Sequence, residues 1–281
     1  MPLMNRDSME LSGSLWWLFI LDTILIAAGG YVINDIFDQQ ADLENKPENQ
    51  FIGKNHLSVK MAWFYYFVLI ATGFIIATYI AYEIEKPHLL LIYPAACALL
   101  FLYSYSFKKH ALIGNVVVAI FCAFVPGIIL YAEWEVIHNA EVLNKTEYEF
   151  LINMFTAYIS FAFLSTMVRE IVKDIEDIAG DTSSGYRTLP IALSKKGAKY
   201  FAIFFGVLLI LSYAFWILPY TATDSIAIFL GLVSIMVVYS IFIVGRLSSA
   251  SVKDDYRLIS KQLKILMVIS LFVFLCIPFL I

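Results

Sequence analysis

Residues 61–82 read MAWFYYFVLIATGFIIATYIAY, a stretch without a single Asp, Glu, Lys or Arg. Its apolar side chains would surround a helix on all sides, which excludes the one-sided pattern of a helix on the surface of a soluble protein. The hydrocarbon core of a bilayer is about 30 Å thick and needs roughly 20 such residues per helix. This stretch therefore predicts a transmembrane helix.

The rest of the chain repeats this pattern. Of the 281 residues, 61% are hydrophobic and 15% are charged, and the mean hydropathy is +0.80. Backbone groups in lipid must be satisfied within their own segment, so long uninterrupted apolar runs indicate helices. We predict an all-α, polytopic bundle that forms a single domain over residues 1–281. It has eight spans, at residues 15–33, 61–82, 88–107, 111–132, 150–168, 200–220, 225–245 and 265–281.

Two short acidic segments interrupt the apolar pattern. Residues 34–42 read NDIFDQQAD, here named the first acidic phrase, and residues 173–181 read KDIEDIAGD, the second acidic phrase. In both, the aspartates recur at offsets that share one face of a helix. They are Asp35, Asp38 and Asp42, and Asp174, Asp177 and Asp181. A repeated spacing at the margin of a membrane bundle favours a functional site over solvated helix ends.

The basic residues predict which side of the membrane holds these phrases. If the loops alternate between two sides, one side receives sixteen of the 19 Lys and Arg residues. Cytoplasmic loops are enriched in Lys and Arg. We therefore expect a multi-pass protein of the cell (inner) membrane with both acidic phrases facing the cytoplasm.

The chemistry of the two phrases indicates a diphosphate site. Six carboxylates on facing helices repel one another unless cations lie between them. Mg²⁺ takes oxygen ligands and commonly bridges one or two carboxylates to substrate phosphates. Metal ions on a diphosphate stabilise the charge that develops as its C–O bond breaks, and the apolar bundle offers a place for a long isoprenoid chain.

These motifs resemble those of the UbiA-type membrane prenyltransferases. The first acidic phrase fits the family's Asn-Asp-x-x-Asp-x-x-x-Asp motif, and the second fits its second Asp-rich motif. Between them, YSFKK at residues 105–109 fits the family's Tyr-x-x-x-Lys element. The segments REIVKDIEDIAGDTSSGYRTLPI, residues 169–191, and LIGN, residues 112–115, most resemble the ether-lipid branch, which makes digeranylgeranylglyceryl phosphate.

The resemblance implies a fold and an activity. The fold would be a bundle of nine helices around a central cavity, so with eight spans we expect the family's first helix to be absent. The activity would be Mg²⁺-dependent transfer of a prenyl group from a prenyl diphosphate, geranylgeranyl diphosphate in this branch, to a membrane-associated acceptor. That acceptor would be geranylgeranylglyceryl phosphate, and the partners would be these substrates and membrane lipid, with no nucleic acid.

Chemistry and resemblance together assign roles to individual residues. The expected metal ligands are Asn34, Asp35, Asp38, Asp42, Asp174, Asp177 and Asp181, with Asp35 as a possible capping or orienting group. The expected diphosphate contacts are Lys46, Tyr105, Lys109, Lys173 and Arg187. The expected catalytic residues are Asp38, Asp177 and Lys109. Each basic residue has an alternative role as an orientation signal, the only role we assign to Lys195, Lys196 and Lys199.

Three other functions stay open. The acceptor could be aromatic, such as a quinone precursor or haem, and the chain could be an inactive truncated homologue. A divalent cation transporter is the third. Transporters place ionisable residues near the bilayer midplane, and here the spans hold almost no charge, with Asp22 as the main exception.

Overall fold

The computed structural model describes residues 10–11, 13–45, 51–53, 57–217 and 226–280. The chain divides into two compact units. Unit 1 holds residues 115–178 and 188–281 together with residues 1–5, and unit 2 holds residues 6–114 and 179–187. The single domain predicted over residues 1–281 stays a prediction.

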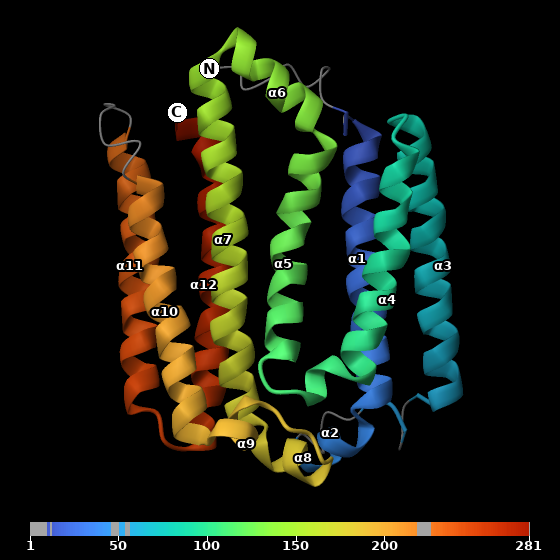
Figure 1. Ribbon diagram of the computed structural model, residues 1–281, viewed down its shortest axis with the longest axis vertical. Helices are drawn as coiled ribbons and strands as arrows, with labels where there is room; N and C mark the ends of the chain where they lie inside the picture. Colours follow the sequence, from blue (N-terminus) through green and yellow to red (C-terminus); the bar gives the residue numbers. More distant parts are fainter. Residues whose placement is uncertain (1–9, 12, 46–50, 54–56, 218–225, 281) are drawn as a thin grey trace. The chain divides into compact units, whose positions relative to one another are not determined.

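The named elements of the described chain are all helical, as predicted (Figure 1). They are α1 (Ser14–Phe37), α2 (Gln39–Asn45), α3 (Val59–Glu83), η3 (Pro87–Leu91), α4 (Ile92–Tyr105), η4 (Phe107–Lys109), α5 (Ile113–Ala132), α6 (Trp134–Leu143), α7 (Lys145–Glu176), α8 (Ile178–Ser183), α9 (Leu189–Leu193), α10 (Lys195–Ile217), α11 (Ile226–Ser249) and α12 (Lys253–Leu280).

Seven stretches of helix in the described residues are long and apolar enough to cross a membrane. They correspond to the first seven predicted spans, and the protein is a multi-pass membrane protein. The eighth predicted span, residues 265–281, falls on the C-terminal part of α12, which is not among the seven. The first turn of α12 carries Asp254 and Asp255, so this helix begins among charged residues.

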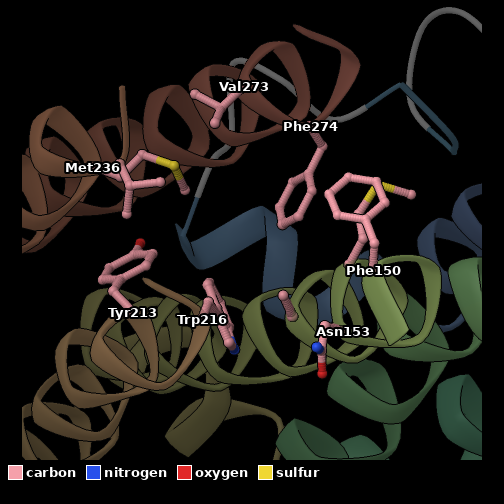
Figure 2. Close-up of a pocket in the computed structure, with 10 residues that line it drawn as sticks. Phe150, Asn153, Tyr213, Trp216, Met236, Val273 and Phe274 are labelled. Atoms are coloured by element: carbon pink, nitrogen blue, oxygen red, sulfur yellow. The ribbon is translucent and has the colours of Figure 1, made fainter. Parts of the chain in front are cut away.

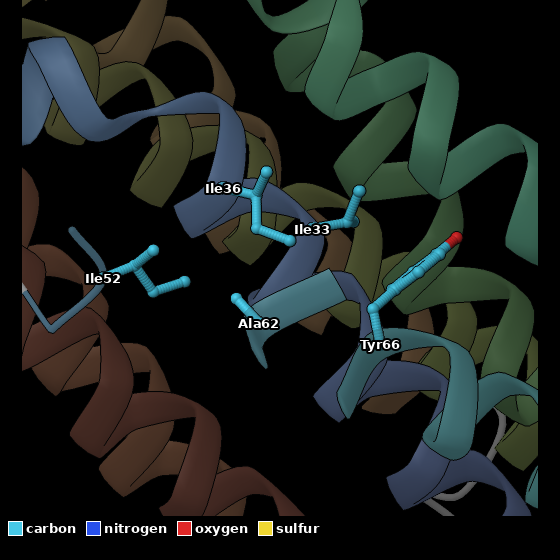
Figure 3. Close-up of a cluster of buried hydrophobic side chains, with 5 residues drawn as sticks. All are labelled: Ile33, Ile36, Ile52, Ala62 and Tyr66. Atoms are coloured by element: carbon cyan, nitrogen blue, oxygen red, sulfur yellow. The ribbon is translucent and has the colours of Figure 1, made fainter. Parts of the chain in front are cut away.

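In unit 2, α1 packs against both α3 and α4 (Figure 1). Its last turns are held by a buried cluster of Ile33, Ile36, Ile52, Ala62 and Tyr66 (Figure 3). Ile33 and Ala62 are completely buried. Because the first acidic phrase begins directly after Ile33, this packing fixes the end of α1 on which the phrase lies.

Asp22, the charge noted inside a predicted span, faces the packed interior of unit 2. Its side chain is buried, and its Oδ1 atom has no hydrogen-bond partner among the residues that the structure describes. A Cβ atom at Gly73 of α3 would lie 3.0 Å from this oxygen and 2.3 Å from the hydroxyl oxygen of Tyr93. The missing side chain at Gly73 therefore makes room for these two polar groups between the helices.

In unit 1, α7 packs against α10 and α12, and α11 packs against the same two helices. Tyr213, Tyr256 and Phe161 are the largest of its fully buried side chains. A side chain of α10 caps the C-terminal end of α11. Lys199 Nζ donates to the carbonyl oxygens of Ser248 and Ala250, at 3.0 Å and 3.1 Å. A cation at this position also interacts favourably with the helix dipole.

Replacing Lys199 with Met should lower the free energy of unfolding by about 1 kcal/mol, because two carbonyl oxygens at the end of α11 lose their donor. Chemical denaturation in detergent measures this change. The matched control is Lys196→Met, since Lys196 Nζ lies 5.9 Å from the centre of the exposed Tyr200 ring. Equal losses in the two variants would contradict the capping role.

Candidate functional site

Each acidic phrase has an interruption at its middle aspartate. Asp38 lies between α1 and α2, and Asp177 lies between α7 and α8. The aspartates of each phrase therefore do not lie on one continuous helix, as their spacing had indicated. At the first phrase, Gln39 Nε2 donates to the carbonyl oxygen of Ile36 at 2.8 Å.

Asp38 is the centre of a polar cluster in unit 2. Lys108 Nζ lies 2.6 Å from Asp38 Oδ1, and the Tyr186 hydroxyl donates to the same oxygen at 3.3 Å. Asn34 Nδ2 donates to Asp38 Oδ2 at 2.7 Å, while Asn34 Oδ1 accepts from Lys108 Nζ at 3.1 Å. Both oxygens of Asp38 are thus held by donors from three separate segments of the chain.

The last aspartate of the second phrase lies near this cluster. Burial raises the pKa of the Tyr186 phenol, and the negative charges of Asp38, Asp181 and Asp42 raise this pKa further. All three carboxylates therefore act on the same phenol, and Asp38 contacts it directly. Within unit 2, Asp181 of the second phrase therefore influences the same tyrosine as Asp38 and Asp42 of the first; that the phrases form one metal site stays a prediction.

A close contact between α2 and α8 joins the two phrases. The backbone N–H of Gly180 donates to Asn45 Oδ1 at 3.0 Å. A Cβ atom at Gly180 would lie 2.5 Å from the carbonyl oxygen of Ala41 and 2.3 Å from Asn45 Nδ2. Only a residue without a side chain fits here, so the glycine in the second phrase is a packing requirement.

Three of the predicted diphosphate contacts lie beside this cluster. The backbone N–H of Arg187 donates to the carbonyl oxygen of Lys109 at 2.8 Å. Lys109 Nζ lies 5.4 Å from the centre of the Tyr105 ring and 5.7 Å from that of Tyr186, within the range of cation–π attraction. Lys109, Arg187 and Tyr105 are therefore neighbours, and the Arg187 side chain is exposed.

The other members of the second phrase lie in unit 1. Asp174 Oδ2 accepts from Asn115 Nδ2 at 2.8 Å, and Asp177 is buried. Lys173 lies in the last turn of α7, and the neighbouring Glu176 accepts from Arg257 Nε of α12 at 3.2 Å. That Asp174, Asp177 and Lys173 act together with the first phrase stays a prediction.

Asp35 and Lys46 are the remaining predicted site residues. The Asp35 side chain is exposed at the end of α1, so its role as a metal ligand stays a prediction. Lys46 lies outside the described residues.

Sequence reasoning missed four residues of this arrangement. Lys108 was passed over because its neighbour Lys109 matched the family element. Tyr186 and Asn115 lay in quoted segments without being given a role. Asn45 follows the first phrase and carries no charge, and nothing in the pattern marked it. A test of every polar residue within a few positions of each phrase would have included Asn45 and Tyr186, but not Lys108 and Asn115, which lie far along the chain from both phrases.

An apolar pocket of unit 1 lies away from Asp174. Tyr213, Trp216, Met236 and Phe274 line it together with residues near the start of α7, among them Phe150 and Asn153 (Figure 2). Along α7, its lining residue Ala157 is separated from Asp174 by about 26 Å. This pocket is therefore not the site of the predicted diphosphate chemistry.

The described residues could supply only some of the ligands of an Mg²⁺ ion. Among them, no group of three or more His, Cys, Asp or Glu side chains is arranged to hold a metal. However, Asn34 Oδ1 and Asp38 Oδ1 both converge on one positive charge, the Lys108 ammonium. Mg²⁺ commonly takes one or two protein oxygens and completes its shell with water and substrate phosphates.

Comparisons with known proteins show the family of this chain. The model of the UbiA prenyltransferase family matches residues 6–277. The chain belongs to the UbiA prenyltransferase family. In that family, it is 31% identical to digeranylgeranylglyceryl phosphate synthase of Thermococcus gammatolerans, over 83% of this chain and 76% of the relative. It is 33% identical to the synthase of Sulfolobus acidocaldarius, over 84% and 78%.

Solved structures show the same fold for this UbiA-family chain. One, described as giving insight into digeranylgeranylglyceryl phosphate synthase in membranes, is 26% identical with a TM-score of 0.61, covering 92% of this chain and 83% of that chain. The other is an apo structure of a UbiA homologue from Aeropyrum pernix, 16% identical with a TM-score of 0.56, covering 89% of both chains.

Gly180→Ala in this UbiA-family protein should separate α8 from α2, because the added methyl group would overlap the Ala41 carbonyl oxygen. We expect loss of at least about 2 kcal/mol of stability or prenyl transfer reduced by tenfold or more. Thermal unfolding and product formation measure these. Gly245→Ala is the control, since a Cβ there meets nothing within 4 Å. A Gly180→Ala protein as active and stable as this control would refute the packing argument.

Tyr186 should make stability depend on pH in the alkaline range. A phenol with a raised pKa holds its proton more tightly in the folded protein, so its contribution is present below about pH 10 and is lost as pH rises toward the folded pKa. Between about pH 10 and 12, the wild type should lose more free energy of unfolding than Tyr186→Phe. Parallel pH profiles for the two proteins would argue against a buried phenol beside the aspartates.

Proposed function

We propose that this UbiA-family protein transfers a geranylgeranyl group from geranylgeranyl diphosphate to the free hydroxyl of geranylgeranylglyceryl phosphate. The observation that carries the proposal is in unit 2, where Gly180 of the second acidic phrase contacts Asn45 of α2 and Lys108 contacts Asp38 of the first phrase. The relatives support the choice of acceptor, because those of 31% to 33% identity named above are digeranylgeranylglyceryl phosphate synthases. The proposed location is the cell membrane, with this site facing the cytoplasm.

The basic residues would hold the diphosphate of the donor. The backbone bridge between Lys109 and Arg187 keeps two cationic side chains together. Arg187 is exposed and offers a planar fork that can hold two phosphate oxygens at once. Lys109 lies between two tyrosine rings, which restrict its position while leaving its ammonium available for a phosphate oxygen.

Asn34, Asp38 and Asp42 would hold one Mg²⁺ ion, and Asp174, Asp177 and Asp181 a second. The bound ions supply charge stabilisation for the leaving diphosphate. The protein's own carboxylates orient those ions, and Tyr186 and Asn34 orient Asp38 by donating to its oxygens. Partners beyond the ligands themselves commonly fix ligand geometry in this way.

The reaction breaks one bond and forms one bond. The C–O bond between the allylic carbon and the diphosphate breaks, and the diphosphate leaves with the electron pair. The acceptor hydroxyl oxygen bonds to that carbon, and its proton is released. Apolar helices around the isoprenoid chain exclude water that would compete with the acceptor.

The product identifies the acceptor. Membranes containing the protein receive labelled geranylgeranyl diphosphate and Mg²⁺, with geranylgeranylglyceryl phosphate or an aromatic acceptor in turn. We expect labelled digeranylgeranylglyceryl phosphate from the first acceptor. A prenylated aromatic product in its place would assign the protein to another branch of chemistry, and no labelled product with any acceptor would refute the proposal.

Asp38→Asn should reduce product formation by more than about a hundredfold, because an amide oxygen without charge binds Mg²⁺ weakly. The matched control is Glu44→Gln in α2, whose side chain is exposed and which carries the same chemical change. Gel filtration in detergent verifies that both variants fold. Wild-type turnover by Asp38→Asn would remove this residue from the site.

A further inference from the structure

The Lys108 ammonium lies where the oxygens of the first acidic phrase converge. It is 2.6 Å from Asp38 Oδ1 and 3.1 Å from Asn34 Oδ1, and its side chain is only 8% exposed. Lysine is almost never buried to this extent unless it is paired. The pair of oxygens therefore already binds a cation, one that belongs to the protein itself.

The backbone holds Lys108 in this position. η4 places it directly after the transmembrane helix α4, and the chain then turns back so that Gly114 packs on it. A Cβ atom at Gly114 would lie 2.8 Å from the Cα atom of Lys108. Leu112 in the same turn has a φ of 66°, a conformation that residues other than Gly rarely adopt. A tight, strained turn thus presents the ammonium to the first phrase.

The adjacent lysine has different contacts. Lys109 Nζ lies over the rings of Tyr105 and Tyr186 at 5.4 Å and 5.7 Å. Two neighbouring ammonium groups are therefore placed differently: one lies on the oxygens of Asp38 and Asn34, and the other lies against aromatic rings. This difference allows the two to be tested against each other.

We propose that Lys108 is an exchangeable counter-cation of the first acidic phrase, which Mg²⁺ must displace from Asp38 and Asn34 before it can bind there. The inference rests on the proposed function, in which these two residues hold Mg²⁺. An ammonium 2.6 Å from a carboxylate oxygen and a divalent ion on the same oxygen would repel each other strongly at low local dielectric. Loading the metal therefore requires the ammonium to leave.

In this exchange, Lys108 has one role before the metal binds and another after it. With no metal bound, Lys108 neutralises part of the charge of the phrase, so the aspartates can pack in unit 2 without a bound metal. After displacement, its long flexible side chain and three donors can reach a phosphate oxygen. Lys108 is thus a positioning residue whose release accompanies the arrival of metal and diphosphate.

The first test is metal affinity without substrate. Mn²⁺, a spectroscopic probe for the Mg²⁺ site, is titrated into the full-length protein in detergent and followed by electron paramagnetic resonance. Removing the competing ammonium in Lys108→Met should tighten binding roughly tenfold, because the fraction of protein with free oxygens rises. Lys109→Met is the matched control: it removes the same charge without touching these oxygens, so its effect should be clearly smaller.

Several results would overturn the proposal. These are unchanged or weaker Mn²⁺ binding in Lys108→Met, no detectable binding in that variant, or equal tightening in Lys109→Met. Lys108→Arg, which keeps a cation of similar reach, should bind Mn²⁺ much as the wild type does. Loss of Mn²⁺ binding in Asp38→Asn, together with product formation by the wild type, verifies the proposed function independently of Lys108.

The second test uses only the wild-type protein, so it does not depend on whether a variant folds. A water-soluble amine-acylating reagent is applied with and without Mg²⁺, and mass spectrometry measures the modification of Lys108 and Lys109 separately. Displacement should raise the acylation rate of Lys108 several-fold on addition of Mg²⁺, with Lys109 as the internal reference. A Lys108 rate that does not respond to Mg²⁺ would refute the exchange.

Discussion

The contact between Gly180 and Asn45 is the constraint on which the site depends. It joins α8 to α2 and so brings a segment from the second acidic phrase beside the first. Asp181 follows Gly180 directly, and Tyr186 lies five residues further along the same segment, so both depend on this contact for their positions. The backbone hydrogen bond from Arg187 to Lys109 holds the other end of this segment, so the two contacts together place Tyr186 beside Asp38 and Lys109.

Charge balance is the second constraint. Negative charges from both phrases act on the phenol of Tyr186, and a positive charge among such carboxylates reduces their mutual repulsion. Lys108 supplies that charge by direct contact, while Lys109 and Arg187 lie beside the cluster. Basic residues on the cytoplasmic side of a membrane protein set its orientation. Here one basic residue, Lys108, also pairs with an aspartate of the first phrase.

The lysines that follow the second phrase illustrate a different use of charge. Lys195 and Lys199 were expected to act only as orientation signals. Instead, Lys199 donates to two carbonyl oxygens at the end of α11, and Lys195 donates to that of Ser251. Composition cannot distinguish these uses, because both require only a cation near the membrane surface. The distinction depends on which carbonyl groups the fold leaves without donors.

The sequence by itself determined that the protein is a bundle of membrane-spanning helices, because apolar runs of about 20 residues have no other stable arrangement in lipid. It also identified the two acidic phrases, since their spacing is a local property. Only the tertiary structure decided that the helices are interrupted at Asp38 and Asp177, and that Lys108 rather than Lys109 binds the first phrase. Those outcomes depend on contacts between segments far apart in the chain, such as Asn45 with Gly180, which local patterns do not encode.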